Sequence, residues 1–170
     1  MKVVQNFNIM YILLVIAQLL ICNYLHLSAL VTVSILPVMT LCLPLSVKTI
    51  PALFIAFFTG LATDALADST LGLNIVALVP VAITRFTVIR LIFGEDTINR
   101  NEDISIKKNG IVKISVAILI AQAVFFIIYI WADGAGTRPL WFNLARFAVS
   151  MAASYIIALI TAHLLTSPSK

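Results

Sequence analysis

The segment FFTGLATDALADSTLGLNIVA, residues 57–77, decides how this chain is organised. Two apolar runs meet here at a short polar break that contains Asp64, Asp68, Gly72 and Asn74. Such a pattern is typical of two membrane helices joined by a tight turn. A carboxylate in this position needs a partner inside the protein, because an unpaired charge in hydrocarbon is costly. The rest of the chain is interpreted around this hairpin.

The composition identifies the class of protein. Of 170 residues, 62% are hydrophobic and 11% are charged, and the mean hydropathy is +1.11. This is more apolar surface than a soluble core of this size could bury, so we expect an integral membrane protein. The net charge of +4 is interpreted as Lys and Arg retained at the cytoplasmic face, without a nucleic-acid partner. Cys22 and Cys42 lie in apolar runs and are expected to fill the core rather than to form a disulfide or a metal site.

Hydropathy and turn residues predict six membrane helices in one membrane domain over residues 1–170. The predicted spans are 7–25, 27–45, 50–67, 71–93, 111–131 and 140–165. The fold class is therefore an all-α six-transmembrane-helix bundle. Pro37 and Pro44 interrupt the second span, which we expect to be kinked or partly re-entrant. The first span follows Lys2 as in a signal peptide, but it lacks a small-x-small cleavage site and is expected to stay.

The distribution of basic residues predicts the orientation. Arg138 is the single basic residue of the predicted outer loops, and Arg85 and Arg146 lie within spans. The other eight of the eleven Lys and Arg lie on the side of the N-terminus, which predicts that both termini are cytoplasmic. Residues 94–110 form a charged cytoplasmic connector or, alternatively, a docking site for a cytoplasmic partner. Possible cytoplasmic contacts are Arg85, Arg90, Arg100, Lys107 and Lys108, the first two by snorkelling to the headgroups.

Three polar residues are predicted to share one depth in the membrane. Counted at about 1.5 Å per residue, Asp64, Asn74 and Arg146 all lie near the outer ends of their spans. We hypothesise that Asp64 and Arg146 form an ion pair, or share a network with Asn74, that ties the central hairpin to the last helix. The alternative is that the three residues form a ligand or ion site.

Little else in the spans points to chemistry. Gln18, Gln122 and Tyr155 are the polar residues near the middle of the membrane, and single amides there usually form hydrogen bonds between helices. The sequence has no HExxH, CxxC, glycine-rich phosphate loop or plausible Ser/His/Asp set. We therefore expect no enzymatic activity, no cofactor and no metal site.

The central hairpin also carries a family resemblance. Its polar and small residues fall in the order Gly60, Leu61, Asp64, Ser69, Thr70, Leu71, Gly72 and Asn74. This pattern, in a six-span chain with a charged loop after the fourth span, resembles the rod shape-determining protein MreD family. The resemblance implies a bacterial inner-membrane subunit of the cell-elongation complex and a six-helix bundle like that of the substrate-binding components of energy-coupling-factor transporters.

The same resemblance implies the partners. An MreD-like subunit would bind MreC, associate with MreB, RodA and the elongation transpeptidase, contact membrane lipid, and support peptidoglycan synthesis and cell shape. We expect it to act as an adaptor that presents a lipid-level groove or face to the single helix of MreC. Two other functions remain open: a vitamin-binding transporter component, with Asp64, Asn74 and Arg146 in its pocket, and an ion or proton transporter. The spans contain few polar residues, which argues against both of these functions.

Overall fold

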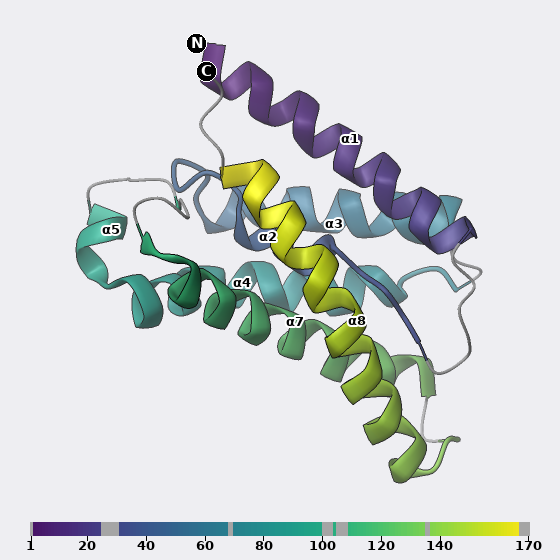
Figure 1. Cartoon of the computed structure of the whole chain (residues 1–170). Helices are drawn as coiled ribbons and strands as arrows, with labels where there is room; N and C mark the ends of the chain where they lie inside the picture. Colours follow the sequence, from purple (N-terminus) through teal and green to yellow (C-terminus); the bar gives the residue numbers. More distant parts are fainter. Residues whose placement is uncertain are drawn as a thin grey trace.

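The described part of the chain is a bundle of seven helices. The computed structural model describes residues 2–24, 31–67, 70–99, 104, 109–134 and 137–166. The helices are α1 (Lys2–Tyr24), α2 (Leu36–Leu41), α3 (Thr49–Leu66), α4 (Leu73–Phe93), α5 (Glu95–Asn99), α7 (Ile111–Gly134) and α8 (Leu140–Thr166) (Figure 1). Five of them, α1, α3, α4, α7 and α8, are long and apolar enough to cross a membrane. The fold is all-α, and these helices support a multi-pass membrane protein.

The ends of α3, α4, α7 and α8 agree with the sequence prediction to within three residues, whereas α1 begins five residues before its predicted span. The start of α4 follows Gly72, which adopts a positive φ of 98°. The same helix ends at Gly94, where φ is 87° and the backbone N–H donates to the carbonyl of Arg90. Glycine tolerates these angles because it has no Cβ, so the turn residues fix where the helices stop.

The second predicted span, residues 27–45, which was expected to be a kinked or partly re-entrant helix, is mostly non-helical in its described part. Residues 31–34 form a non-helical segment, Ile35 is the N-cap residue of α2, and α2 provides less than two helical turns. Pro37 is the second residue of α2, a position whose N–H has no helical partner, so it starts this helix rather than kinking a longer one. The β-branched residues Val31, Thr32 and Val33 favour the extended conformation before it.

Side chains of two neighbouring helices bind the backbone of this extended segment. The N–H groups of Thr32 and Ser34 donate to the hydroxyls of Ser150 and Ser154 on α8, at 3.0 and 3.1 Å. Two residues of extended chain span about 6.6 Å and four residues of helix rise about 6 Å, so the two spacings match. On the other side, Gln18 of α1 accepts from Ile35 N at 2.8 Å. Non-helical backbone can therefore lie inside the bundle without unpaired N–H groups at these positions.

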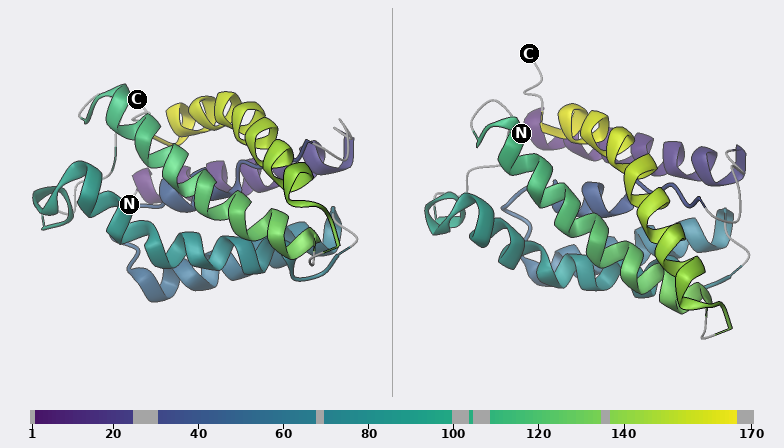
Figure 2. Two further views of the ribbon diagram at one scale, coloured as in Figure 1. Left: turned by 90° about the horizontal axis from the view of Figure 1, so that it is seen from below. Right: turned by 60° about the horizontal axis from the view of Figure 1, so that its bottom comes forward.

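The helices are arranged around α2. All six residues of α2 are buried, and α2 contacts α1, α3, α4, α7 and α8. The most extensive helix pairs are α3 with α4, α4 with α7, and α7 with α8, whereas α1 lies at the edge with 11% of its apolar span buried. In every view the start of α1, the end of α8 and α5 lie at one end of the bundle, and the turn between α7 and α8 lies at the other (Figure 2).

Candidate functional site

The carboxylate of Asp64 binds the start of the neighbouring helix α4. Its Oδ1 accepts from the backbone N–H and the side-chain amide of Asn74, at 3.0 and 2.9 Å. Its Oδ2 accepts from Gly72 N at 2.9 Å and, at a longer 3.4 Å, from Ile75 N. The first N–H groups of a helix have no partner within the helix, and a negative charge is stabilised there. Gly72 has no side chain to cap α4, and Asp64 performs this role from α3.

Glycine allows the two helices to approach closely enough for this bond. A Cβ on Gly60 would lie 3.0 Å from the N and Cα of Ile75, so α3 and α4 touch through their backbones at this point. Because Gly60 and Asp64 are four residues apart, they lie on the same face of α3. Asp64 is fully buried and Asn74 is 3% exposed. Asp64 binds Asn74, but the predicted network that also includes Arg146 is not formed; the contact closes the hairpin and does not tie it to α8.

The remaining motif residues lie on the surface of the hairpin or outside the described part. Leu61 and Leu71 are exposed by 37% and 74%, and Thr70 is also exposed. Ser69 lies outside the described residues. The motif thus has an inner set of residues that builds the turn and an outer set that is available to lipid or to another protein.

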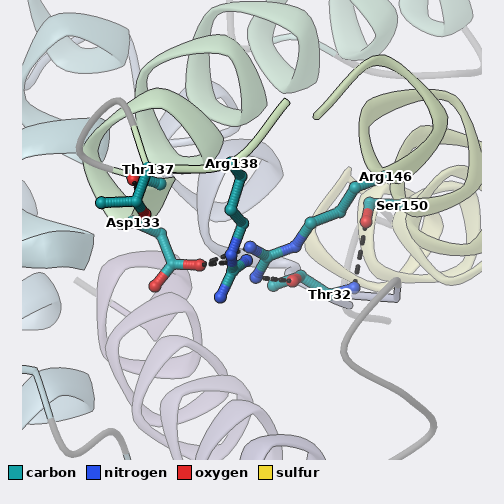
Figure 3. A network of polar contacts seen from close by, with 7 residues as sticks. Thr32, Asp133, Thr137, Arg138, Arg146 and Ser150 are labelled. Carbon is teal, nitrogen blue, oxygen red and sulfur yellow. Dashed lines mark hydrogen bonds and ion pairs between the residues drawn. The ribbon is translucent and has the colours of Figure 1, made fainter. Parts of the chain in front are cut away.

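The predicted ion pair between Asp64 and Arg146 is wrong. Arg146 is 7% exposed, and its guanidinium pairs instead with Asp133 at the end of α7 through a short contact, and donates to Thr32 Oγ1 at 3.0 Å (Figure 3). Arg138, in the turn before α8, contacts the same Asp133 oxygen at 3.1 Å. Counting depth along the helices predicted that Arg146 and Asp64 share one layer, but Asp64 binds the start of α4 whereas Arg146 binds Asp133 and Thr32.

The prediction that Arg85 snorkels to the membrane surface is also wrong. Arg85 is 1% exposed and lies over the C-terminal end of α2. Its guanidinium donates to the carbonyls of Leu41 at 3.3 Å, Pro44 at 3.0 Å and Val47 at 3.0 Å, and to that of Leu43 through a short contact. The last carbonyls of a helix have no partner within the helix, and a cation stabilises that end. Arg85 therefore holds α2 and the turn after it.

The other predicted cytoplasmic contacts are only partly visible. Arg90 is on the surface, with 63% of its side chain exposed, and pairs with Glu95 of α5 at 3.2 Å. Arg100, Lys107 and Lys108 lie outside the described residues. The role of residues 94–110 as a docking site stays a prediction.

The two mid-membrane glutamines differ. Gln18 joins α1 to the extended segment, because it accepts from Ile35 N and donates to Val33 O at 3.3 Å. Gln122 of α7 is fully buried, and neither atom of its amide has a hydrogen-bond partner among the described residues. Tyr155 packs, partly buried, against the core. Among the described residues, the three do not form a chain of hydrogen bonds across the bundle.

Sequence reasoning missed Asp133, Ser150 and Ser154. Asp133 is the only acidic residue after Asp103, and it was the nearest possible partner for Arg146 along the chain. The two serines are four residues apart, a spacing that places both hydroxyls on one face of a helix. The sequence therefore contained evidence for both features, but it gave no indication of the extended backbone whose N–H groups the serines bind.

Two apolar grooves open on the surface of the bundle. One, of about 460 Å³, lies between α3 and α4 and is lined by Ile50, Leu53, Phe54, Phe57, Phe58 and Val79. The other, of about 490 Å³, lies between α7 and α8 and is lined by Phe126, Ile127, Ile130, Trp131, Leu140, Trp141, Asn143, Leu144 and Phe147. Among the described residues, no group of three or more His, Cys, Asp or Glu is placed to hold a metal ion.

Comparison with known proteins gave no match. No family model, no curated protein and no solved structure is similar enough to the chain to place it in a family. Function is therefore argued from the arrangement of the residues.

Proposed function

We propose that this chain is a non-enzymatic subunit of the bacterial cytoplasmic membrane, similar to MreD, that binds MreC within the cell-elongation complex. In that complex it would associate with MreB, RodA and the elongation transpeptidase and support peptidoglycan synthesis. The observation that carries the proposal is the Asp64 cap: Gly60, Asp64, Gly72 and Asn74 of the motif meet at one point and build the turn between α3 and α4.

This geometry favours a scaffold over a ligand-binding protein. Both oxygens of Asp64 accept hydrogen bonds within the hairpin, and Arg146 is engaged by Asp133 and Thr32 elsewhere. Of the three residues considered for a vitamin pocket, Asp64 and Asn74 bind each other and stabilise the turn, and Arg146 has other partners. An adaptor needs a rigid bundle with exposed faces. The motif contributes to this rigidity, because it holds α3 against α4.

We further propose that the extended segment and α2 together form a second membrane crossing, so that the bundle crosses six times in the manner of energy-coupling-factor substrate-binding components. The backbone of a non-helical crossing must be satisfied by the protein around it, and Ser150, Ser154, Gln18 and Arg85 do this. The positive-inside distribution favours cytoplasmic termini. The start of α1 and the end of α8 lie at one end of the bundle (Figure 2), as expected if both termini are on the same side of the membrane.

The groove between α3 and α4 is the face that we assign to the MreC helix. All six of its lining residues are apolar, and three are phenylalanines. Phe54 and Phe58 are exposed by 60% and 62%, one turn apart on α3. Aromatic side chains supply large contact areas at interfaces, and an apolar transmembrane helix can pack against such a row without placing a charge in lipid.

Co-purification tests the proposal. Tagged chain is co-expressed with MreC, and MreC recovered from detergent-solubilised membranes is quantified. The double variant Phe54→Ala and Phe58→Ala should lower MreC recovery several-fold at unchanged yield of the chain, because aromatic anchors contribute most at interfaces. The matched control is Ile156→Ala with Ile160→Ala, two similarly exposed positions one turn apart on α8. Wild-type chain that retains a vitamin and recovers no MreC would overturn the proposal.

A further inference from the structure

The turn between α7 and α8 holds more positive than negative charge. Arg138 and Arg146 both contact Oδ2 of Asp133, so two guanidinium groups share one carboxylate oxygen (Figure 3). The side chains of Arg146, Asp133 and Arg138 are 9%, 21% and 37% exposed, which places the cluster between the interior and the surface. Among the described residues of this cluster, one positive charge is left uncompensated. Two cations held this close together favour a second anion.

Two buried polar atoms beside this cluster also have no hydrogen-bond partner in the part of the chain that the structure describes. They are Nε of Arg146, a donor, and Oδ1 of Asn143, an acceptor. Because the two residues are three apart on α8, they are neighbours on the same side of the helix. Buried polar atoms in folded proteins are nearly always paired, so each unpaired atom requires an explanation. A ligand with an anionic acceptor and a hydroxyl donor would satisfy both after a shift of the side chains that cover these atoms.

The apolar groove between α7 and α8 begins at the same level. Asn143 lines this groove, and its amide faces Gly134, the residue after Asp133. Trp131 and Trp141 also line it and are 62% and 80% exposed. Indole rings favour the boundary between headgroups and hydrocarbon. The charged cluster, the amide and the tryptophans therefore share the depth of a lipid headgroup, with an apolar channel running from them along two membrane helices.

We propose that this place binds an anionic phospholipid. Its phosphodiester lies against Arg138 and Arg146, a headgroup hydroxyl donates to Oδ1 of Asn143, and one acyl chain lies in the groove. The single negative charge of the phosphodiester matches the single excess positive charge of the cluster. Arginine binds phosphate oxygens well because its planar fork presents several N–H donors. The groove selects lipid over a soluble phosphate, since a soluble anion would leave the channel unfilled. The site is independent of the MreC assignment, which concerns the groove between α3 and α4.

The two tryptophans make the site directly observable. The chain has only Trp131 and Trp141, and both line this groove, so the whole tryptophan emission reports on it. The full chain is reconstituted in vesicles of phosphatidylcholine that contain increasing fractions of brominated phosphatidylglycerol or, in parallel, brominated phosphatidylcholine. Bromine quenches tryptophan on contact. We expect phosphatidylglycerol to bind about fivefold more tightly, the contribution of one basic residue at the membrane surface.

Three variants separate the site from general charge effects. Arg138→Gln should bring the preference for phosphatidylglycerol close to one. Asp133→Asn should raise it, because the carboxylate that competes for the arginines is removed. Arg90→Gln, at the other end of the bundle, is the matched control and should leave the preference unchanged, because that arginine is exposed and pairs with Glu95.

Several results would overturn the assignment. Equal quenching by both lipids in the wild-type chain would mean that no anionic lipid is selected. An equal loss in Arg138→Gln and Arg90→Gln would indicate only net charge. If inorganic phosphate abolished the preference and shifted tryptophan emission in pure phosphatidylcholine, the site would bind a soluble oxyanion. A folded Asp133→Asn protein that lost the preference would mean that the cluster is a structural ion pair; if this variant does not fold, the comparison of Arg138→Gln with Arg90→Gln decides.

Discussion

Replacing Asp64 with alanine should destabilise the bundle, and the size of the effect can be worked out from its contacts. Three donors lie within 3.0 Å of the carboxylate: Gly72 N, Asn74 N and Asn74 Nδ2. A hydrogen bond to a charged group contributes about 1.5–3 kcal/mol, which gives an upper limit of about 4.5–9 kcal/mol for the three. Gly72 is only half-buried, so water can replace its bond to Asp64 in the variant. The alanine variant also avoids the free-energy cost of burying a carboxylate. We therefore expect the free energy of unfolding to fall by about 3 kcal/mol.

The assay is equilibrium unfolding of the purified chain in mixed micelles with increasing denaturing detergent, followed by circular dichroism. Asp64→Asn should lose less stability than Asp64→Ala, because it keeps one acceptor oxygen. Asp96→Ala, an exposed aspartate on α5, is the control and should change stability by less than about 0.5 kcal/mol. The reasoning is refuted if Asp64→Ala unfolds like the wild-type chain or like this control. Recovery of co-expressed MreC should fall with the folded fraction, and a folded Asp64→Ala protein that lost MreC would instead make Asp64 a direct contact.

Three further changes test the contacts that hold the bundle together, each by the same unfolding measurement. Gly60→Ala should cost about 1–3 kcal/mol, because its Cβ would press on the backbone of α4; wild-type stability would mean that the two helices are farther apart. Arg85→Met removes the donor to four carbonyls and should cost about 3 kcal/mol, whereas Arg90→Met at the surface should cost little; equal effects would contradict the burial of Arg85. Ser150→Ala and Ser154→Ala should each cost about 1–2 kcal/mol, since each leaves a backbone N–H of the extended segment unpaired, and no loss in either would argue that this segment is not bound to α8.

The features that could be read correctly from the sequence are those that depend on short stretches of chain. Hydropathy over about 20 residues locates the five long helices, because membrane thickness fixes their length. Gly72 and Gly94 mark helix ends because their backbone angles are local properties. The link between Asp64 and Asn74 was predictable for the same reason, since a tight turn brings residues ten apart into contact.

Only the tertiary structure determined the backbone conformation of residues 31–45 and the partners of the two buried arginines, Arg85 and Arg146. Hydropathy predicted one of six membrane helices over residues 27–45. The non-helical segment can lie inside the bundle because its N–H groups donate to serines that are 118 and 120 residues away in the sequence. Sequence gives the depth of a side chain along its helix, at a fixed rise per residue. It does not give the rotation of that helix against its neighbours. Asp64 and Arg146 therefore share a predicted depth without meeting, and Arg85 faces the carbonyls after α2 where depth alone predicted the headgroups.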